Sequence, residues 1–570
     1  MGMFLPCTAE EIKRLGWDAP DIILVSGDTY LDTPFSGVAL IGRILTQAGF
    51  RTAIIAQPSI DKLDDIKRLG EPHLFWGVSG GCVDSMVANF TAMGKRRRQD
   101  DFTPGGENNA RPDRAVIAYC NLIRSAFKPC KPLVIGGIEA SLRRIAHYDV
   151  WTDAVRRPLL FDAKADILVY GMADRTIVEL AKRFRDKKDW HDLRGICYSA
   201  PTASINLPEA LSLPAFSEVS AKSDEGHRQF MSMFRQFSAN QEAHTAKPLI
   251  QPVDTRALVH NPPAKPLSQA ELDAAYNLPF ELDTHPFYGA KGPVRAWDTI
   301  RFSITTHRGC YGECNFCAIA AHQGRTVVSR SERSIIAEAT RFLKHPKFKG
   351  VISDVGGPTA NMYGFECEKK LCAGACADKH CLFPTCCNAL KPTHHPQLHL
   401  LRALRALPGI RHVFVASGIR PDLVAADKNQ GLTYIDELAA YHVSGQLKLA
   451  PEHVTKHILE FMGKPPLDST LLFKERFDAT NRKLGKRQFL TYYFIAAHPG
   501  CIDDDMRQLK KFAKSKLFLT PEQVQVFTPT PSTWSTAMYY TGINPASNKT
   551  IPVARTFRER QTQKDLLTSP

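Results

Sequence analysis

The sequence lacks the long apolar runs and leader patterns of membrane-bound or exported proteins. No apolar stretch approaches the roughly 18 residues that a membrane helix needs. Met1 to Cys7 contain no basic region followed by an apolar run, and Pro6 stands where the myristoylation pattern needs Ser or Thr. We therefore expect a soluble, cytoplasmic protein that has no membrane partner.

The sequence also lacks an arginine-rich arm and a recognised RNA-binding motif. It is nevertheless basic, because 73 Lys and Arg outnumber 58 Asp and Glu and give a net charge of +15. A basic surface attracts RNA and other anions, but the excess is spread over 570 residues. Composition leaves two readings open: an RNA partner, or a mildly basic enzyme with none.

Cysteines are concentrated in one part of the chain. Of 15 cysteines, nine lie between Cys310 and Cys387. In a long chain without an export leader, a disulfide framework is not expected. Clustered thiols in this setting indicate metal binding.

Short apolar runs alternate with helical patterns along most of the chain. The first part, residues 1–200, contains strand candidates at 21–25, 52–56, 74–78, 132–135 and 166–170. Such alternation predicts a doubly wound parallel sheet covered on both faces. Residues 201–293 are rich in Pro and polar residues, and we expect a helical connector followed by a linker.

The alternation returns in a second domain, which we expect at 294–565. Its strand candidates are 300–306, 350–355, 411–416, 445–449, 489–496 and 522–528. Six strand–helix steps with right-handed crossings predict a partial (βα)6 barrel. Ligands in such an α/β fold bind at the carboxyl ends of the strands.

Three cysteines follow the first strand of this second domain. Cys310, Cys314 and Cys317 form a C-x3-C-x2-C segment whose soft thiolates favour an Fe–S cluster or zinc. Three ligands leave one iron of a cubane cluster open, and open positions are typical of catalytic metal sites. The alternative is a zinc knuckle that takes a fourth ligand such as His307.

With Phe316 as the aromatic residue, this segment resembles the C-x3-C-x-aromatic-C signature of radical S-adenosylmethionine (SAM) enzymes. The resemblance implies a [4Fe–4S] cluster on the three cysteines and SAM bound at the open iron. It also implies reductive cleavage of SAM by one electron from a donor such as a flavodoxin or ferredoxin. No catalytic residue for the substrate is assigned.

Later strand ends resemble SAM-binding elements of this family. Gly356 and Gly357 resemble its Gly-Gly-Glu element, which holds the SAM amino group, although Pro358 replaces the Glu. Ser417 and Arg420 lie in a segment similar to one of the methylthiotransferase branch, which implies a contact with the SAM carboxylate. Glu452 is placed to accept from the ribose hydroxyls. The alternatives are an ordinary glycine turn and a structural arginine that bridges loops.

Over nearly its whole length the chain is similar to the YgiQ family of radical SAM proteins. The matching segments are 28–32, 136–144, 354–363 and 447–453.

A second group of cysteines forms an insertion at 365–395. Between 365 and 387 it contains Cys367, Cys372, Cys376, Cys381, Cys386 and Cys387. These thiols could bind a second Fe–S cluster or a zinc ion, and the alternative is a loop without metal.

The N-terminal domain resembles the cobalamin-binding domains that precede some radical SAM barrels. Domains that ligate cobalamin through histidine use Asp-x-His-x-x-Gly, whereas residues 32–37 read Asp-Thr-Pro-Phe-Ser-Gly and contain no histidine. This argues against cobalamin and favours a substrate-recruiting scaffold of similar shape.

Three functions remain open. The first is a radical SAM enzyme that modifies RNA or protein, by methylthio or methyl transfer, and the second is one that acts on a small metabolite. The third is a non-catalytic zinc or Fe–S protein that binds nucleic acid. Cleavage of SAM to 5′-deoxyadenosine separates the first two from the third.

Overall fold

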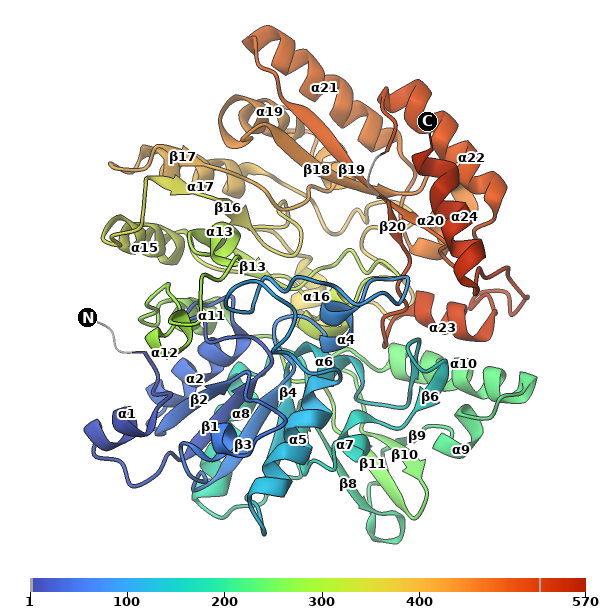
Figure 1. Ribbon diagram of the computed structural model, residues 1–570. Helices are drawn as coiled ribbons and strands as arrows, with labels where there is room; N and C mark the ends of the chain where they lie inside the picture. Colours follow the sequence, from blue (N-terminus) through green and yellow to red (C-terminus); the bar gives the residue numbers. More distant parts are fainter. Residues whose placement is uncertain (1–3, 522–523, 570) are drawn as a thin grey trace. The chain divides into compact units, whose positions relative to one another are not determined.

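The largest sheet of the computed structural model has nine strands in the order β2-β1-β3-β4-β7-β8-β11-β10-β9 (Figure 1). The structure describes residues 4–521 and 524–569. The strands β1 to β4 and β7 pair in parallel, and most of their residues are buried, which explains their apolar sequences. Their bounds are β1 Ile22–Ser26, β2 Thr52–Ala56, β3 Phe75–Ser79, β4 Leu133–Gly136 and β7 Ile167–Val169.

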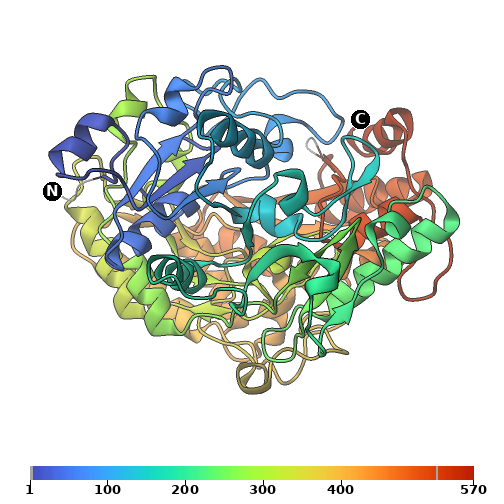
Figure 2. The same ribbon diagram turned by 90° about the horizontal axis from the view of Figure 1, so that it is seen from below.

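Helices cover both faces of these parallel strands. In Figure 2, α2 (Gly37–Gln47) and α8 (Asp174–Arg185) lie on one side of the sheet and α5 (Ala115–Ala126) lies on the other. Ala39 and Leu45 of α2 and Leu180 of α8 join a buried core with Ile22 and Leu24 of β1. The predicted parallel sheet is therefore the centre of the N-terminal part.

Residues 201–266 differ from the predicted connector and linker. Strand β10 (Leu249–Val253) pairs antiparallel with β11 (Arg256–His260), and β11 pairs antiparallel with β8 (Ile196–Pro201), while β9 (Leu211–Ser212) forms the far edge of the sheet. The helix α10 (Asp224–Ala239) lies between β9 and β10 in sequence. Alternating burial along β10 reveals a strand signal that Pro248 and Pro252 hide in the sequence.

A second series of parallel strands follows residue 302. Strand β12 pairs with β16, β15 with β17, β18 with β19, and β19 with β20. The bounds are β12 Ser303–Thr305, β15 Val351–Ile352, β16 Asp354–Gly356, β17 His412–Val413, β18 Gln446–Glu452, β19 Phe489–Ala496 and β20 Gln525–Val526. The predicted last strand begins at 522, and its residues 522–523 lie outside the described part of the chain.

Helices separate these strands, as a (βα)6 arrangement requires. They are α15 Glu332–Leu343, α17 His395–Ala406, α19 Gly431–Glu437, α20 Lys456–Met462, α21 Asp468–Leu484 and α22 Asp503–Phe512, followed by α23 Trp534–Thr541 and α24 Phe557–Thr568. Ser331 caps α15, because its hydroxyl accepts from the Ser334 amide at 3.1 Å. No helix among the described residues has both the length and the apolar character that crossing a bilayer requires.

The chain divides into two compact units. One comprises Met1–Pro266 and Ala274–Arg301, and the other comprises Leu267–Asp273 and Phe302–Pro570. The nine-stranded sheet belongs to the first unit, and the series from β12 to β20 belongs to the second.

Candidate functional site

The cysteine loop, residues 309–317, follows the short strand β13 (His307–Arg308). Gly309 has a φ of +86°, and a Cβ atom at this position would lie 2.0 Å from the Thr326 carbonyl oxygen. Only glycine fits this turn. It sends the chain into a bend in which Cys310, Cys314 and Cys317 are all partly buried and free of disulfides.

N–H groups surround the thiols of this loop. The Gly312 amide donates to Cys310 Sγ at 3.4 Å, and Arg420 Nη1 donates to Cys314 Sγ at 3.5 Å. Burial, with a smaller contribution from Cys314, raises the pKa of Cys317 to about 12. Thiols that influence one another in this way need a positive partner to ionise together.

No three His, Cys, Asp or Glu side chains come together as a preformed metal site within residues 4–521 and 524–569. The fit of the cysteine loop to a [4Fe–4S] cluster therefore depends on its donors. These are three soft thiols in one bend, with N–H groups directed at two of the sulfurs.

Asn315 fastens the cysteine loop to two helices. Its amide donates to the Met462 carbonyl at 2.9 Å, and its side-chain nitrogen donates to the Phe461 carbonyl at 2.9 Å, both at the end of α20. Its carbonyl accepts from the amide of Ser535, in α23, at 2.9 Å. The Ser535 hydroxyl in turn contacts His498 Nε2 at 2.7 Å. Residues far apart in sequence thus hold the loop.

Gly356 and Gly357 lie where β16 ends, and both allow close packing. The Gly356 carbonyl accepts from the Thr306 amide at 2.7 Å. A Cβ atom on Gly356 would lie 3.2 Å from the Ser417 side chain, and one on Gly357 would lie 2.6 Å from the His307 ring. The two glycines therefore bring the first three strand ends of the second unit together.

Ser417 is engaged with Asp354, at the start of β16. Its hydroxyl donates to the Asp354 carboxylate, and the amides of Ala416 and Ser417 donate to the same carboxylate at 2.8 and 3.1 Å. The side chain thus fixes the third strand end against the second. A contact from its hydroxyl to a ligand would compete with Asp354.

Arg420 lies beside the cysteine loop and is nearly buried, with 8% of its surface exposed. It donates to Asp422 from Nε at 3.0 Å and from Nη2 at 2.6 Å, besides its contact with Cys314. Burial opposes the charge on Asp422, but the Arg420 guanidinium holds the pKa of this carboxyl below its usual range. Arg420 therefore brings a fixed positive charge to the thiols.

Glu452 ends β18 with a φ of +67° and is buried. Burial raises the pKa of its carboxyl, and the charges of Lys464 and Arg420 act in the opposite direction. Its charge also contributes to the raised pKa of Cys317, so the two side chains lie within electrostatic reach. Phe316 is half-buried within the cysteine loop.

A buried polar chain that no sequence motif indicates supports Arg420 from behind. Asn361 accepts from the Arg420 amide at 2.9 Å and donates to the Arg420 carbonyl at 3.0 Å. Its side-chain nitrogen lies 3.2 Å from His394 Nε2, and His394 Nδ1 lies 2.9 Å from Asp427. These residues are up to 66 positions apart, from 361 to 427, so their spacing carries no local signal.

The cysteine-rich insertion packs against the cysteine loop. Cys367 and Leu382 are buried in a cluster with Tyr311, and Cys310, Cys381 and Cys386 pack against this cluster. Lys370 Nζ donates to the Arg325 carbonyl at 2.7 Å and lies 3.8 Å from Cys381 Sγ. Burial raises the pKa of Cys386 to about 12. The insertion thus forms one wall around the first cysteine of the motif.

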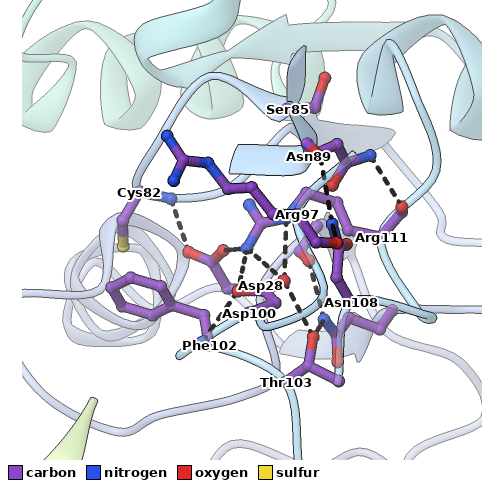
Figure 3. Close-up of polar contacts among 12 residues, drawn as sticks. Asp28, Cys82, Ser85, Asn89, Arg97, Asp100, Phe102, Thr103, Asn108 and Arg111 are labelled. Atoms are coloured by element: carbon purple, nitrogen blue, oxygen red, sulfur yellow. Dashed lines mark hydrogen bonds and ion pairs between the residues drawn. The ribbon is translucent and has the colours of Figure 1, made fainter. Parts of the chain in front are cut away.

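The carboxyl ends of the N-terminal strands do not fit cobalamin bound through histidine. The segment 32–37 has no imidazole, and the chain is tightly packed at this edge. A Cβ atom on Gly27 would lie 2.2 Å from the Gly80 carbonyl, and one on Gly81 would lie 2.3 Å from Asp28 Oδ1. Arg111 fills the space beside them and pairs with Asp28 at 2.7 Å (Figure 3).

Comparison with sequence families agrees with the division of the chain into two compact units. Residues 4–303 match the Radical SAM N-terminal family, residues 304–513 match the Radical SAM superfamily, and residues 522–569 match a domain of unknown function, DUF3362. The chain is thus a radical SAM protein, a membership that implies a [4Fe–4S] cluster, SAM and an electron donor.

Full-length relatives narrow this class. A UPF0313 protein of Fusobacterium nucleatum is 53% identical over 99% of this chain and 98% of its own length. A UPF0313 protein of Thermotoga maritima is 46% identical with the same coverage. The chain belongs to the UPF0313 family, which is the YgiQ-type family of radical SAM proteins. The family membership that the sequence motifs indicated is confirmed.

Two solved structures share the fold at low sequence identity. The radical SAM methyltransferase TsrM from Kitasatospora setae, with cobalamin and a [4Fe–4S] cluster bound, has a TM-score of 0.50 and 14% identity over 91% of this chain and 77% of TsrM. The cobalamin-dependent SAM radical enzyme OxsB has a TM-score of 0.50 and 13% identity over 87% of this chain and 52% of OxsB. These likenesses confirm the predicted fold class of an α/β N-terminal sheet followed by a radical SAM barrel.

Proposed function

We propose that this protein is an enzyme that cleaves SAM reductively at a [4Fe–4S] cluster held by Cys310, Cys314 and Cys317, and that it modifies an RNA or protein substrate. The observation that carries the proposal is the bend at 309–317. Three cysteines lie in this one bend, and the Gly312 amide and the Arg420 guanidinium donate to two of their sulfurs. When bound, the cluster and SAM supply one-electron cleavage of the sulfonium S–C5′ bond.

The surrounding residues are proposed to bind and orient SAM. Gly356 and Gly357 offer main-chain groups where a side chain would clash, which suits an approach by the SAM amino group. Among residues 4–521 and 524–569, no group hydrogen-bonds to the Glu452 carboxylate, which is free to accept from ribose hydroxyls. Ser417 and Arg420 remain the predicted contacts of the SAM carboxylate, and Arg420 also offsets the negative charge of the thiolates. Phe316 contributes apolar surface within the loop.

The chain is further proposed to work without cobalamin. TsrM and OxsB are described with cobalamin, but in this chain Arg111 pairs with Asp28 at the carboxyl ends of the N-terminal strands, and residues 32–37 contain no histidine. A flavodoxin or ferredoxin is the proposed class of electron donor. A second metal centre in 365–387 stays a prediction.

Anaerobic reconstitution, iron quantification and a dithionite-driven assay for 5′-deoxyadenosine test the proposal. About four irons per chain with product formation would support one cluster, and about eight would support a second in the insertion. Cys314→Ala should abolish product formation, whereas Cys130→Ala, a half-buried cysteine of the other unit, should leave it unchanged. Full product formation by Cys314→Ala would refute the cluster assignment, and tightly bound zinc without product would favour a non-catalytic nucleic-acid-binding protein.

A further inference from the structure

Four consecutive basic residues lie exposed on the loop that follows α4 (Ser85–Asn89), the short helix after β3. Lys95, Arg96, Arg97 and Arg98 all belong to the exposed stretch 94–99. The run is too short to count as an arginine-rich arm in the sequence. Its position nevertheless suggests a binding role, because the run lies in the connection between β3 and α5, beyond the carboxyl end of a parallel strand. Ligands of open α/β sheets bind at this edge.

The basic loop is held in place by its neighbours. The Arg97 amide donates to the Asn89 carbonyl at 2.7 Å, and the Asn108 amide donates to the Arg98 carbonyl at 3.1 Å. The Asn108 side chain donates to the Arg97 carbonyl at 3.1 Å (Figure 3). The backbone that carries these side chains is therefore ordered before any partner binds, which lowers the entropic cost of binding.

Buried ion pairs close the sheet edge from which this loop extends. Arg111 is 1% exposed and lies between Asp28, at 2.7 Å, and Asp100, at 3.0 Å (Figure 3). Cys82 adds an amide that donates to Asp28 at 2.5 Å. A small cofactor at this edge would have to displace these pairs, and leaving a buried charge unpaired is costly. The edge is thus suited to a partner that stays on its outer surface.

The positive charge of the run is largely uncompensated. Arg96 pairs with Asp113 at 3.3 Å, whereas Arg97 Nε donates only to the carbonyls of Val87 and Phe90. Among the described residues, no acidic side chain pairs with Lys95, Arg97 or Arg98. Asp101 and Glu107 are exposed elsewhere on the loop, and Glu107 contacts Asn109. Guanidinium groups that have no acidic partner can bind phosphate through paired N–H donors.

We propose that the Lys95–Arg98 run binds the phosphate backbone of a folded RNA, so that the N-terminal unit recruits an RNA substrate. The proposal rests on the proposed function, since it selects RNA from the two substrate classes named there. Consecutive cations without interleaved aromatic residues indicate contacts with phosphates rather than stacking on bases. Binding is therefore expected to depend strongly on salt and weakly on sequence.

Fluorescence anisotropy with a labelled RNA stem–loop tests this inference on the full chain carrying Cys314→Ala, which separates binding from SAM chemistry. Lys95→Gln/Arg97→Gln/Arg98→Gln should weaken RNA binding at least about tenfold and lower the slope of log Kd against log salt by about two to three. The control Lys13→Gln/Lys62→Gln/Lys67→Gln removes the same charge from exposed positions of the same unit and should leave the Kd within about twofold.

Three results would overturn the proposal: no RNA binding by the parent protein, equal losses in the two triple variants, or equal affinity for a DNA stem–loop of the same sequence. Introduced into the chain with all its cysteines, the loop variant should still form 5′-deoxyadenosine at the parent rate. Loss of RNA binding with SAM cleavage retained would support the proposal. Absence of SAM cleavage in the parent would instead count against the proposed function and leave the RNA-binding result intact.

Discussion

Replacing Arg420 by Met should destabilise the barrel by removing one member of a buried pair. Arg420 is 8% exposed, and its guanidinium holds Asp422 through contacts at 3.0 and 2.6 Å. The variant leaves the Asp422 carboxylate without its partner in a site that is poorly solvated. Breaking such a pair typically costs about 3–5 kcal/mol of the free energy of unfolding. We expect a loss in this range.

Urea unfolding followed by circular dichroism, before cluster reconstitution, measures this loss. Hydrogen exchange of peptides spanning 309–317 shows whether the cysteine loop loosens as well, because Arg420 Nη1 contacts Cys314 Sγ. Arg228→Met is the control, since Arg228 pairs with Glu225 at 2.8 Å while both side chains are exposed, at 62% and 59%. An exposed pair of this kind contributes at most about 1 kcal/mol.

A double variant separates the lost pair from the lost packing. In Arg420→Met/Asp422→Leu no buried charge is left unpaired, so most of the stability should return. The reasoning would be refuted if Arg420→Met cost no more than Arg228→Met. It would also be refuted if the double variant were as unstable as the single one.

Two further predictions concern the cysteine loop and its support. Gly309→Ala places a Cβ atom 2.0 Å from the Thr326 carbonyl at a φ of +86°, so reconstituted iron per chain should fall at least about twofold. The control is Gly418→Ala, which should retain its iron because a Cβ atom there meets nothing within 4 Å. Equal iron content in the two variants would contradict the steric argument. Burial lowers the pKa of His498 to about 4, below its value of 6.5 in the unfolded chain, so its contribution is complete above pH 6.5 and is lost as the pH falls toward 4. His498→Gln also alters the contact with Ser535. In this variant the free energy of unfolding, measured by thermal denaturation, should fall by up to about 3 kcal/mol less between pH 6.5 and 4 than in the parent. An unchanged pH dependence would count against a buried neutral imidazole.

Local patterns in the sequence determined the elements and the chemistry of the motif. Strand 489–496 was predicted with the bounds that the structure has, because its apolar residues lie within one continuous segment. The three cysteines of the motif lie within eight residues, 310–317, so their spacing alone indicated a shared metal. Radical SAM class and fold class followed from these continuous signals.

Contacts between distant segments were decided only by the tertiary structure. Arg420 is 106 residues from Cys314, and Ser535 is still farther from Asn315, so no spacing rule relates them. The hairpin of β10 and β11 also depends on a distant segment, because β11 pairs with β8. Its sequence alone gives a weak strand signal, since β10 contains proline. In the same way, a short basic run became a candidate RNA-binding surface only because the fold fixes its backbone and pairs the charges beneath it. Folding brings such groups together, and their spacing along the sequence does not indicate these contacts.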